Sequence, residues 1–463
     1  MRRTLLSTLV LSLLIALSPA PAQARSGGYD AYLREALEAT GLPGMSVVVT
    51  RGDQVLHAAG LGHDADGRPV TADTPMRVAS VSKSFTAATV LSLVGEGRVA
   101  LDQPVVGYLP EFRTADPRSD RITVRHLLDQ TSGLSDRTLD VTATQRAADL
   151  SGYLAVLRDG RLAADPGTHY EYCNVNFDVA ARLVEVVDGR DFADAVRARI
   201  FEPLGMTTSG VGDRQVRPAA GFNSIYGAWV SRAELPGFRF GGSGSVVSTA
   251  TDMGRWLIGQ TGQGPRFLTP AALTTLHRSW TDGDYAMGWS RHEVDGRRLL
   301  VHTGNLFTYT AIQAFDPHSG LGLAVLLNSA SLYEDNYDVL VGLLAIADGR
   351  QPAAPGGTRQ LIDLGLAAGA LIAIGLGVLG VVRAGRWAQR ARWWRMGGVL
   401  LPVVVLATYP QWVSFLSNGR TVTWAQVTYF PAPLTITLGV AAAAGLATAA
   451  ARLIRLRAVR SGG

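Results

Sequence analysis

The sequence of 463 residues contains a single lysine and a single cysteine, against 42 arginines. One cysteine, Cys173, excludes a disulfide within the chain, so stability must come from a packed core. The eight histidines show no His-Glu-x-x-His or comparable ligand spacing, and no glycine-rich nucleotide-binding motif is present. We therefore expect a globular fold with neither a metal site nor another cofactor.

The chain also lacks a basic surface pattern, although its net charge is +5. Ten arginines and no acidic residue occur from Arg383 onward, and two more arginines lie at positions 2 and 3. Taking these twelve charges from +5 leaves −7 for the rest of the chain. A nucleic-acid partner is therefore not expected, because the positive charge is concentrated next to apolar segments rather than on a folded face.

The N-terminus has the pattern of an export signal. Two arginines precede an uncharged run over 4–17, and Ala-Gln-Ala at 22–24 is typical of a cleavage site. We predict a signal peptide over 1–24 and a mature chain that starts at Arg25. An uncleaved membrane anchor is the alternative interpretation.

Three long uncharged runs occupy the C-terminal part. Each is long enough to cross the roughly 30 Å hydrocarbon layer as a helix. We predict transmembrane helices over 361–383, 396–416 and 429–451. Residues 349–360, rich in proline and glycine, are expected to link the first of them to the preceding domain.

Arginines set the expected orientation of these helices. Five lie between the first two predicted helices and four follow the third, and such segments stay cytoplasmic. The chain is then a multi-pass protein of the cell membrane, with a cytoplasmic C-terminus and the domain before the helices outside the cytoplasm. Trp424, Tyr429 and Phe430 are expected in the outer interfacial belt.

Residues 25–348 mix strand and helix patterns. Strands are predicted over 45–50, 54–59, 299–302, 309–315 and 321–327. Helices are predicted over 85–94, 123–128, 177–187, 192–200 and 250–258. The predicted fold class is α+β, with an antiparallel sheet built from both ends of the domain and a helical insertion between them.

Ser80 and Lys83 stand at the start of the apolar helix predicted over 85–94. Side chains three residues apart lie on one face of a helix, so the hydroxyl and the amine are expected to be close. The helix dipole favours a developing alkoxide at this end, and burial favours the neutral amine that a general base requires. We predict that Ser80 is a nucleophile activated by Lys83.

The rarity of lysine supports this role independently. Wherever a positive charge was enough, the chain uses arginine, which stays protonated and cannot accept a proton from serine. Lys83 occurs at the position where the predicted reaction needs a group that can accept the serine proton, which arginine cannot do.

Two further motifs follow the Ser80-x-x-Lys83 motif. They are Tyr172-Cys173-Asn174 and His302-Thr303-Gly304. In this order and spacing the chain resembles the class C β-lactamase and D-alanyl-D-alanine carboxypeptidase family of penicillin-binding-protein-like serine hydrolases, over about 29–344. The resemblance implies the β-lactamase/DD-peptidase-like fold with a helical subdomain, and hydrolysis through an acyl-enzyme.

The resemblance also implies roles. Ser80 attacks a carbonyl, Lys83 assists and Tyr172 moves a proton, and whether Lys83 or Tyr172 is the general base stays open. The backbone N–H groups of Ser80 and Asn305 form the oxyanion hole. The implied substrate-binding residues are Asn174, His302, Thr303, Gly304 and Asn305. Tyr170 is expected to be a wall of the site, and Cys173 a small filler rather than a nucleophile.

Two departures from the family pattern bear on the substrate. His302 stands where class C β-lactamases have lysine, and 305–309 reads Asn-Leu-Phe-Thr-Tyr where relatives often have Gly-Thr-Pro-Gly-Phe. These residues favour a carboxypeptidase, D-aminopeptidase or esterase that acts on a peptide, amide or ester bond of a small molecule or peptide. The alternatives are a penicillin-binding sensor or slowly acylating binding module, and a β-lactamase. The substrate, its stereochemistry and the oligomeric state are left open.

Overall fold

The structure is a computed structural model of the chain. It describes residues 22–235, 240–278, 284–353, 355–390, 393–417 and 419–461. Residues 1–21 of the predicted signal peptide lie outside these described residues.

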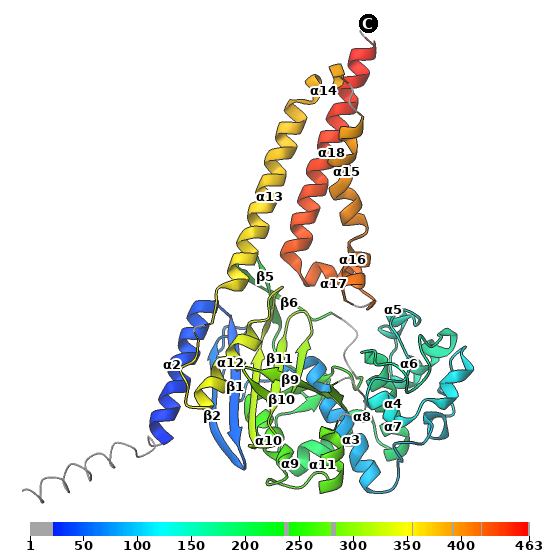
Figure 1. Cartoon of the computed structure of the whole chain (residues 1–463), viewed down its shortest axis with the longest axis vertical. Helices are drawn as coiled ribbons and strands as arrows, with labels where there is room; N and C mark the ends of the chain where they lie inside the picture. Colours follow the sequence, from blue (N-terminus) through cyan, green and yellow to red (C-terminus); the bar gives the residue numbers. More distant parts are fainter. Residues whose placement is uncertain are drawn as a thin grey trace, which may run out of the picture.

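A seven-stranded antiparallel sheet forms the centre of the described part of the domain (Figure 1). Its strands in spatial order are β2 (Gln54–Gly62), β1 (Gly44–Arg51), β12 (Leu321–Leu327), β11 (Thr310–Phe315), β10 (Arg297–Asn305), β9 (Trp289–Val294) and β8 (Tyr285–Ala286). Met45 of β1 pairs with Leu327 of β12, so the two ends of the domain meet in the middle of the sheet. The predicted hairpin and the three C-terminal strands are thus confirmed.

Alternating side chains give the sheet two apolar faces. Val47 and Val49 of β1 pack with Leu340 under α2 (Ala22–Thr40) and α12 (Asp335–Ala347). Val48 points to the opposite face and joins the larger core that contains Phe85. Helices α3 (Ser82–Gly95), α10 (Ala250–Gln260) and α11 (Pro270–His277) contribute to that larger core. Burial on both sides explains why the central strands read as continuous apolar runs.

A helical lobe lies beside the sheet. Its helices include α4 (Val124–Leu128), α5 (Val141–Thr144), α6 (Leu150–Val156), α7 (Asn174–Asp188) and α8 (Phe192–Val196). The short helix α9 (Glu202–Leu204) follows and lies near α10. Two small three-stranded sheets are also present. One consists of β3 (Met76–Arg77), β7 (Val246–Ser248) and β4 (Gly210–Val211). The other consists of β13 (Ser329–Ala330), β5 (Gly221–Ile225) and β6 (Ala228–Arg232). The lobe is the predicted helical insertion.

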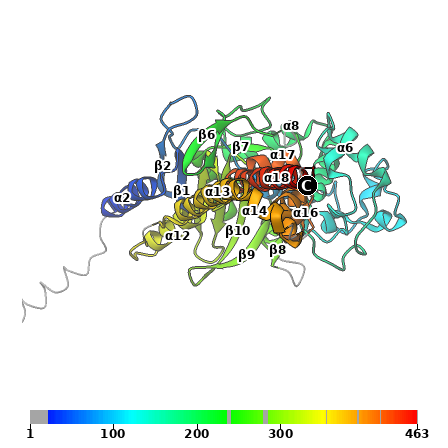
Figure 2. The ribbon, with the colours of Figure 1, turned by 90° about the horizontal axis from the view of Figure 1, so that it is seen from above.

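The C-terminal helices form a long bundle that projects from the domain (Figures 1 and 2). They are α13 (Thr358–Val382), α14 (Ala384–Arg390), α15 (Trp394–Ala407), α16 (Tyr409–Leu416), α17 (Trp424–Tyr429) and α18 (Ala432–Ser461). Two of the described helices, α13 and α18, are long and apolar enough to cross a membrane. Apolar side chains of α13 such as Leu364 and Leu371 are more than 60% exposed, as expected of a surface that faces lipid.

The second predicted membrane helix, 396–416, is not one straight helix. It consists of α15 and α16, which are bent by 64° at Thr408. Pro410, in the first turn of α16, has no N–H to continue the helical ladder and restricts the residue before it. The pair makes a third span only if it crosses as one broken helix.

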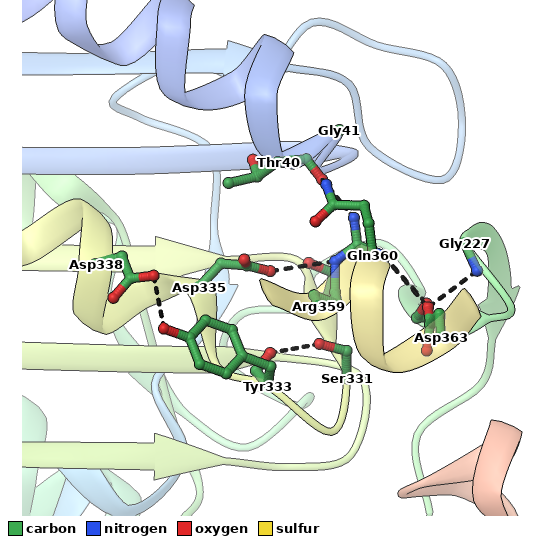
Figure 3. A network of polar contacts seen from close by, with 12 residues as sticks. Thr40, Gly41, Gly227, Ser331, Tyr333, Asp335, Asp338, Arg359, Gln360 and Asp363 are labelled. Atoms are coloured by element: carbon green, nitrogen blue, oxygen red, sulfur yellow. Dashed lines mark hydrogen bonds and ion pairs between the residues drawn. The ribbon is translucent and has the colours of Figure 1, made fainter. Parts of the chain in front are cut away.

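The start of α13 is fixed to the domain by a buried polar network (Figure 3). Arg359 lies between Asp335 and Asp363, with N···O distances of 3.3 and 3.6 Å, and donates to the carbonyl of Thr40. Asp363 also accepts the Gly227 N–H at 2.9 Å. Residues 358–360 of the predicted linker therefore form the first turn of α13, and the bundle starts from a fixed position.

Candidate active site

Ser80 lies in a short 3₁₀ turn, Ala79–Val81, that leads into α3. Ala79 has a φ of +50°, a strained conformation for a residue with a Cβ. The turn leaves Ser80 partly exposed, whereas Lys83, in the first turn of α3, is completely buried. The sequence predicted both groups at this helix start, and the structure brings them together.

The amine of Lys83 has three oxygen neighbours. Its Nζ lies 2.9 Å from Asn174 Oδ1, 2.7 Å from the carbonyl oxygen of Ser243 and 3.2 Å from Ser80 Oγ. The first two oxygens can only accept, so each of them takes one N–H of the amine. In the neutral amine this leaves the lone pair for the hydroxyl of Ser80.

Electrostatics favour that neutral form. Burial lowers the pKa of Lys83, the nearby Tyr172 opposes this shift, and the positive charge of Arg420 adds to it. A lysine with a lowered pKa can take a proton from serine.

The position of Lys83 depends on the loop that carries Ser243, a contact that the sequence did not predict. Asp178, one turn beyond Asn174 on α7, accepts the Ser243 N–H at 3.0 Å and its hydroxyl at 3.1 Å. The loop lies so close to α7 that a Cβ on Gly241 or Gly242 would clash with it. Asp178 thereby fixes the carbonyl that holds Lys83.

Tyr172 lies against Lys83, with Nζ 4.8 Å from the centre of its ring. Its segment is held by Gln130, whose side-chain oxygen accepts the N–H of Cys173 at 3.0 Å and the amide of Asn176 at 2.6 Å. Gln130 follows α4, and these two hydrogen bonds tie that part of the lobe to the segment that carries Tyr172 and Asn174.

The neighbours of Tyr172 also have clear positions. Cys173 is fully buried, its thiol donates to Asp136 at 3.3 Å, and burial raises its pKa. It is therefore a poor nucleophile, as expected. Tyr170 packs on Tyr285 with ring centres 5.7 Å apart, and its position as a wall of the site stays a prediction.

Strand β10 brings the third motif to Ser80. A Cβ on Gly304 would lie 2.9 Å from the Ser80 nitrogen and closer still to the Val78 carbonyl. His302 is buried, and burial lowers its pKa to about 3. The lowered pKa keeps His302 neutral at ordinary pH, and its proton lies on Nδ1, which donates to the Thr303 carbonyl at 2.7 Å.

The side chain of Asn305 makes two hydrogen bonds within the domain. The amide donates to Glu334 at 2.9 Å and accepts the Phe307 N–H at 2.8 Å. These contacts fix the conformation of Asn305, which lines the same two cavities as Ser80 and to which the resemblance assigned an oxyanion-hole donor.

Two cavities, of about 350 and 520 Å³, meet at Ser80. Both are lined by Asn305 and Arg420, and the larger one also by Tyr172 and Thr303. The smaller one has an unexpected wall from the C-terminal segment, formed by Val413, Ser417, Arg420, Thr421, Val422, Gln426 and Phe430. Their size suits a small organic ligand.

Tyr429 and Phe430 were expected in the outer interfacial belt, but they contact the domain. Tyr429 stacks on Arg232 at 3.5 Å and donates to the Ala233 carbonyl at 3.0 Å, while Phe430 lines the cavity.

No cluster of three or more histidine, cysteine or acidic residues suited to a metal occurs within the ranges that the structure describes. The groups that meet at the nucleophile are instead the hydroxyl of Ser80, the amine of Lys83 and the ring of Tyr172.

This geometry can be compared with known proteins. The model of the Beta-lactamase family matches residues 29–345. The chain belongs to this family. It is 29% identical over 358 residues to penicillin-binding protein 4 of Amycolatopsis lactamdurans, covering 71% of this chain and 92% of that protein.

Two other similarities of this beta-lactamase-family chain are informative. Esterase EstB of Burkholderia gladioli is 36% identical over 197 residues, which cover 39% of this chain and 50% of the esterase. The crystal structure of a D-stereospecific amidohydrolase from Streptomyces matches with a TM-score of 0.54 and 25% identity, over 65% of this chain and 94% of that one. The predicted α+β fold, family and serine hydrolase class are thereby confirmed.

Proposed function

We propose that the chain is a membrane-anchored hydrolase that cleaves a peptide, amide or ester bond through an acyl-enzyme on Ser80. The observation that carries the proposal is the arrangement at Lys83. Two carbonyl-type oxygens take its N–H groups, and its lone pair is left for the Ser80 hydroxyl 3.2 Å away.

In this mechanism Lys83 removes the proton as Ser80 Oγ attacks the substrate carbonyl. The backbone N–H groups of Ser80 and Asn305 stabilise the oxyanion. Tyr172, in contact with Lys83, passes the proton to the leaving amine or alcohol. Water then attacks the acyl-enzyme with the same groups in reverse, which releases the acid and restores Ser80.

The position of the substrate follows from the same residues. We place the substrate amide at Asn174 and the substrate backbone along Thr303 of β10. His302 and Gly304, the neighbours of Thr303 on this strand, complete the proposed binding site. Thr303 is exposed on the strand and lines the larger cavity. The named activities of the esterase and the D-stereospecific amidohydrolase support ester and amide substrates, and the neutral His302 argues against a β-lactamase.

The proposed topology places the hydrolase outside the cytoplasm and the C-terminus inside. The exposed apolar surface of α13 supports the membrane anchor. Both arginine-rich segments lie at the end of the bundle remote from the catalytic domain (Figure 1), which supports this orientation.

A fluorophosphonate probe is expected to label the full-length wild type, and Ser80→Ala is expected to abolish labelling. Ser92→Ala, at the other end of α3, is the matched control and should label normally. Equal labelling of Ser80→Ala, or none of a folded wild type, would remove the proposal. Labelling followed by no turnover of D-alanyl dipeptides, N-acyl-D-amino acid amides, short-chain esters or a chromogenic cephalosporin would favour the slowly acylating binding module.

The rate is also expected to depend on pH with a definite sign. Below the pKa of Lys83 the amine is protonated and cannot accept the serine proton, so kcat/KM should rise with pH through that pKa. Burial lowers this pKa, so the rise should be centred below the ordinary lysine value. His302, with a pKa of about 3, does not titrate in this range. A profile with a neutral ester that is flat from about pH 5 to about pH 10 would contradict the role of Lys83.

A further inference from the structure

Arg420 stands apart from the other arginines of the C-terminal segment. Of the ten from Arg383 onward, nine lie in the two segments predicted to be cytoplasmic. Arg420 is the tenth, in the loop between α16 and α17 at the opposite end of the bundle, next to the catalytic domain (Figure 1). Topology accounts for the nine and leaves Arg420 without an explanation.

The loop that carries Arg420 is bound to the catalytic domain. The hydroxyl of Thr421 donates to the Asp136 carbonyl at 2.9 Å, and Arg420 Nε lies 3.6 Å from the carboxylate of Asp136. Tyr226 of the domain bonds the hydroxyl of Thr437 on α18 at 2.8 Å. With the network around Arg359, these contacts hold the loop over the active site.

The guanidinium of Arg420 points into the site. Its carbon lies 5.2 Å from the ring centre of Tyr172, and the residue lines both cavities that contain Ser80. The ion pair joins Arg420 Nε to a carboxylate oxygen of Asp136 at 3.6 Å, a distance longer than a hydrogen bond. Among the described residues no acceptor is hydrogen-bonded to the two terminal nitrogens, and the side chain is 40% exposed. This edge of the guanidinium is free to bind a ligand.

Arg420 is also the main positive charge of these cavities. Among the described residues that line them, it is the only arginine or lysine, and the charged groups beside it are Asp136, Asp178, Glu293 and Glu334. His302, where related β-lactamases have a lysine, is neutral. Among the described lining residues, Arg420 is therefore the one cationic side chain that a negatively charged substrate group can meet.

We propose that Arg420 is a specificity-determining residue, which binds a carboxylate of the substrate while Ser80 attacks its scissile carbonyl. The inference rests on the proposed function and defines its substrate class as acyl compounds with a free carboxylate. The planar fork of the guanidinium fits a carboxylate with two parallel hydrogen bonds. The membrane segment thus supplies part of the substrate site.

The test compares two ligands that differ in one charge. N-acetyl-D-alanyl-D-alanine and its C-terminal amide are added to full-length protein in detergent, and the rate of Ser80 labelling by a neutral fluorophosphonate is measured. The carboxylate is expected to protect wild type at a roughly 10- to 100-fold lower concentration than the amide, in the range of a charged hydrogen bond. Arg420→Met should lose that difference, and Arg420→Lys should keep part of it.

Arg232→Met is the matched control. It removes a guanidinium from the same interface, where Arg232 stacks on Tyr429, but Arg232 lines neither cavity. This variant should keep the preference for the carboxylate. Equal protection by the two ligands in wild type, or an equal preference in Arg420→Met, would overturn the inference while labelling still supports the hydrolase. Absence of labelling in wild type would instead remove the proposed function.

Discussion

Lys83→Arg is expected to lower kcat/KM by at least about 10²-fold, and up to about 10⁴-fold, the usual contribution of a positioned general base. The substitution keeps the positive charge and removes the titratable amine. In the wild type the amine donates to Asn174 and to the Ser243 carbonyl and is left with one lone pair for Ser80. A guanidinium has no such lone pair, so residue 83 can no longer accept the proton of Ser80. The measurement is steady-state hydrolysis of a neutral ester at several pH values.

A second variant separates chemistry from packing. Lys83 is completely buried, and the wider guanidinium strains its pocket. Lys83→Met has a similar length and no charge, so it is expected to fold and to show the same loss of rate. It should also lose the rise of kcat/KM with pH. Turnover close to wild type in either variant would rule out Lys83 as the base.

The parts of the site that the sequence predicted are those set by local geometry. Ser80 and Lys83 are three residues apart at the start of one helix, and this spacing alone places them together. The central strands were likewise predictable because Val47, Val48 and Val49 belong to a short apolar run bounded by turn residues, and a sheet covered on both faces buries all three.

Other parts depend on contacts between distant segments. Asp178 shares a helix face with Asn174, but its partner Ser243 comes 65 residues later. The contact that holds the Arg420 loop joins Thr421 to Asp136 across 285 residues. One signal was present in the sequence, since Arg420 is a lone arginine in a loop predicted outside the cytoplasm. Hydropathy could not reveal that this loop covers the active site.

The break in the second predicted membrane helix has a different cause. Leu416 and its neighbours are apolar enough to continue the predicted span, and hydropathy measures only that property. The missing N–H of Pro410 has no effect on hydropathy, yet it ends the hydrogen-bonded ladder. The bend places the end of α16, with Val413 and Ser417, against the cavity.

Gly304→Ala is the second substitution with a large expected effect. The new methyl group would lie 2.9 Å from both the Ser80 nitrogen and the Ala79 Cβ, and closer to the Val78 carbonyl. Backbone surrounds the position, so either β10 or the turn that carries Ser80 must move. Each of them carries one proposed donor of the oxyanion hole, and loss of one donor costs roughly 10²- to 10³-fold in kcat.

The matched control is Gly95→Ala at the end of α3. There the new Cβ meets the Thr269 methyl at 3.6 Å, an ordinary contact. Gly95→Ala should keep wild-type kcat. For Gly304→Ala, overpacking costs about 1 to 3 kcal/mol, so the protein should remain folded by circular dichroism with a lower Tm.

Comparing the folding of Gly304→Ala with its kcat and KM shows which role Gly304 has. If Gly304→Ala folds and kcat falls while KM changes little, the lost interaction belongs to the transition state, as expected for the oxyanion hole. A rise in KM alone would mean that Gly304 serves substrate binding only. Wild-type kcat in the folded variant would show that β10 can move away from Ser80 without cost, and the proposed pairing of Ser80 and Asn305 as oxyanion donors would then be wrong.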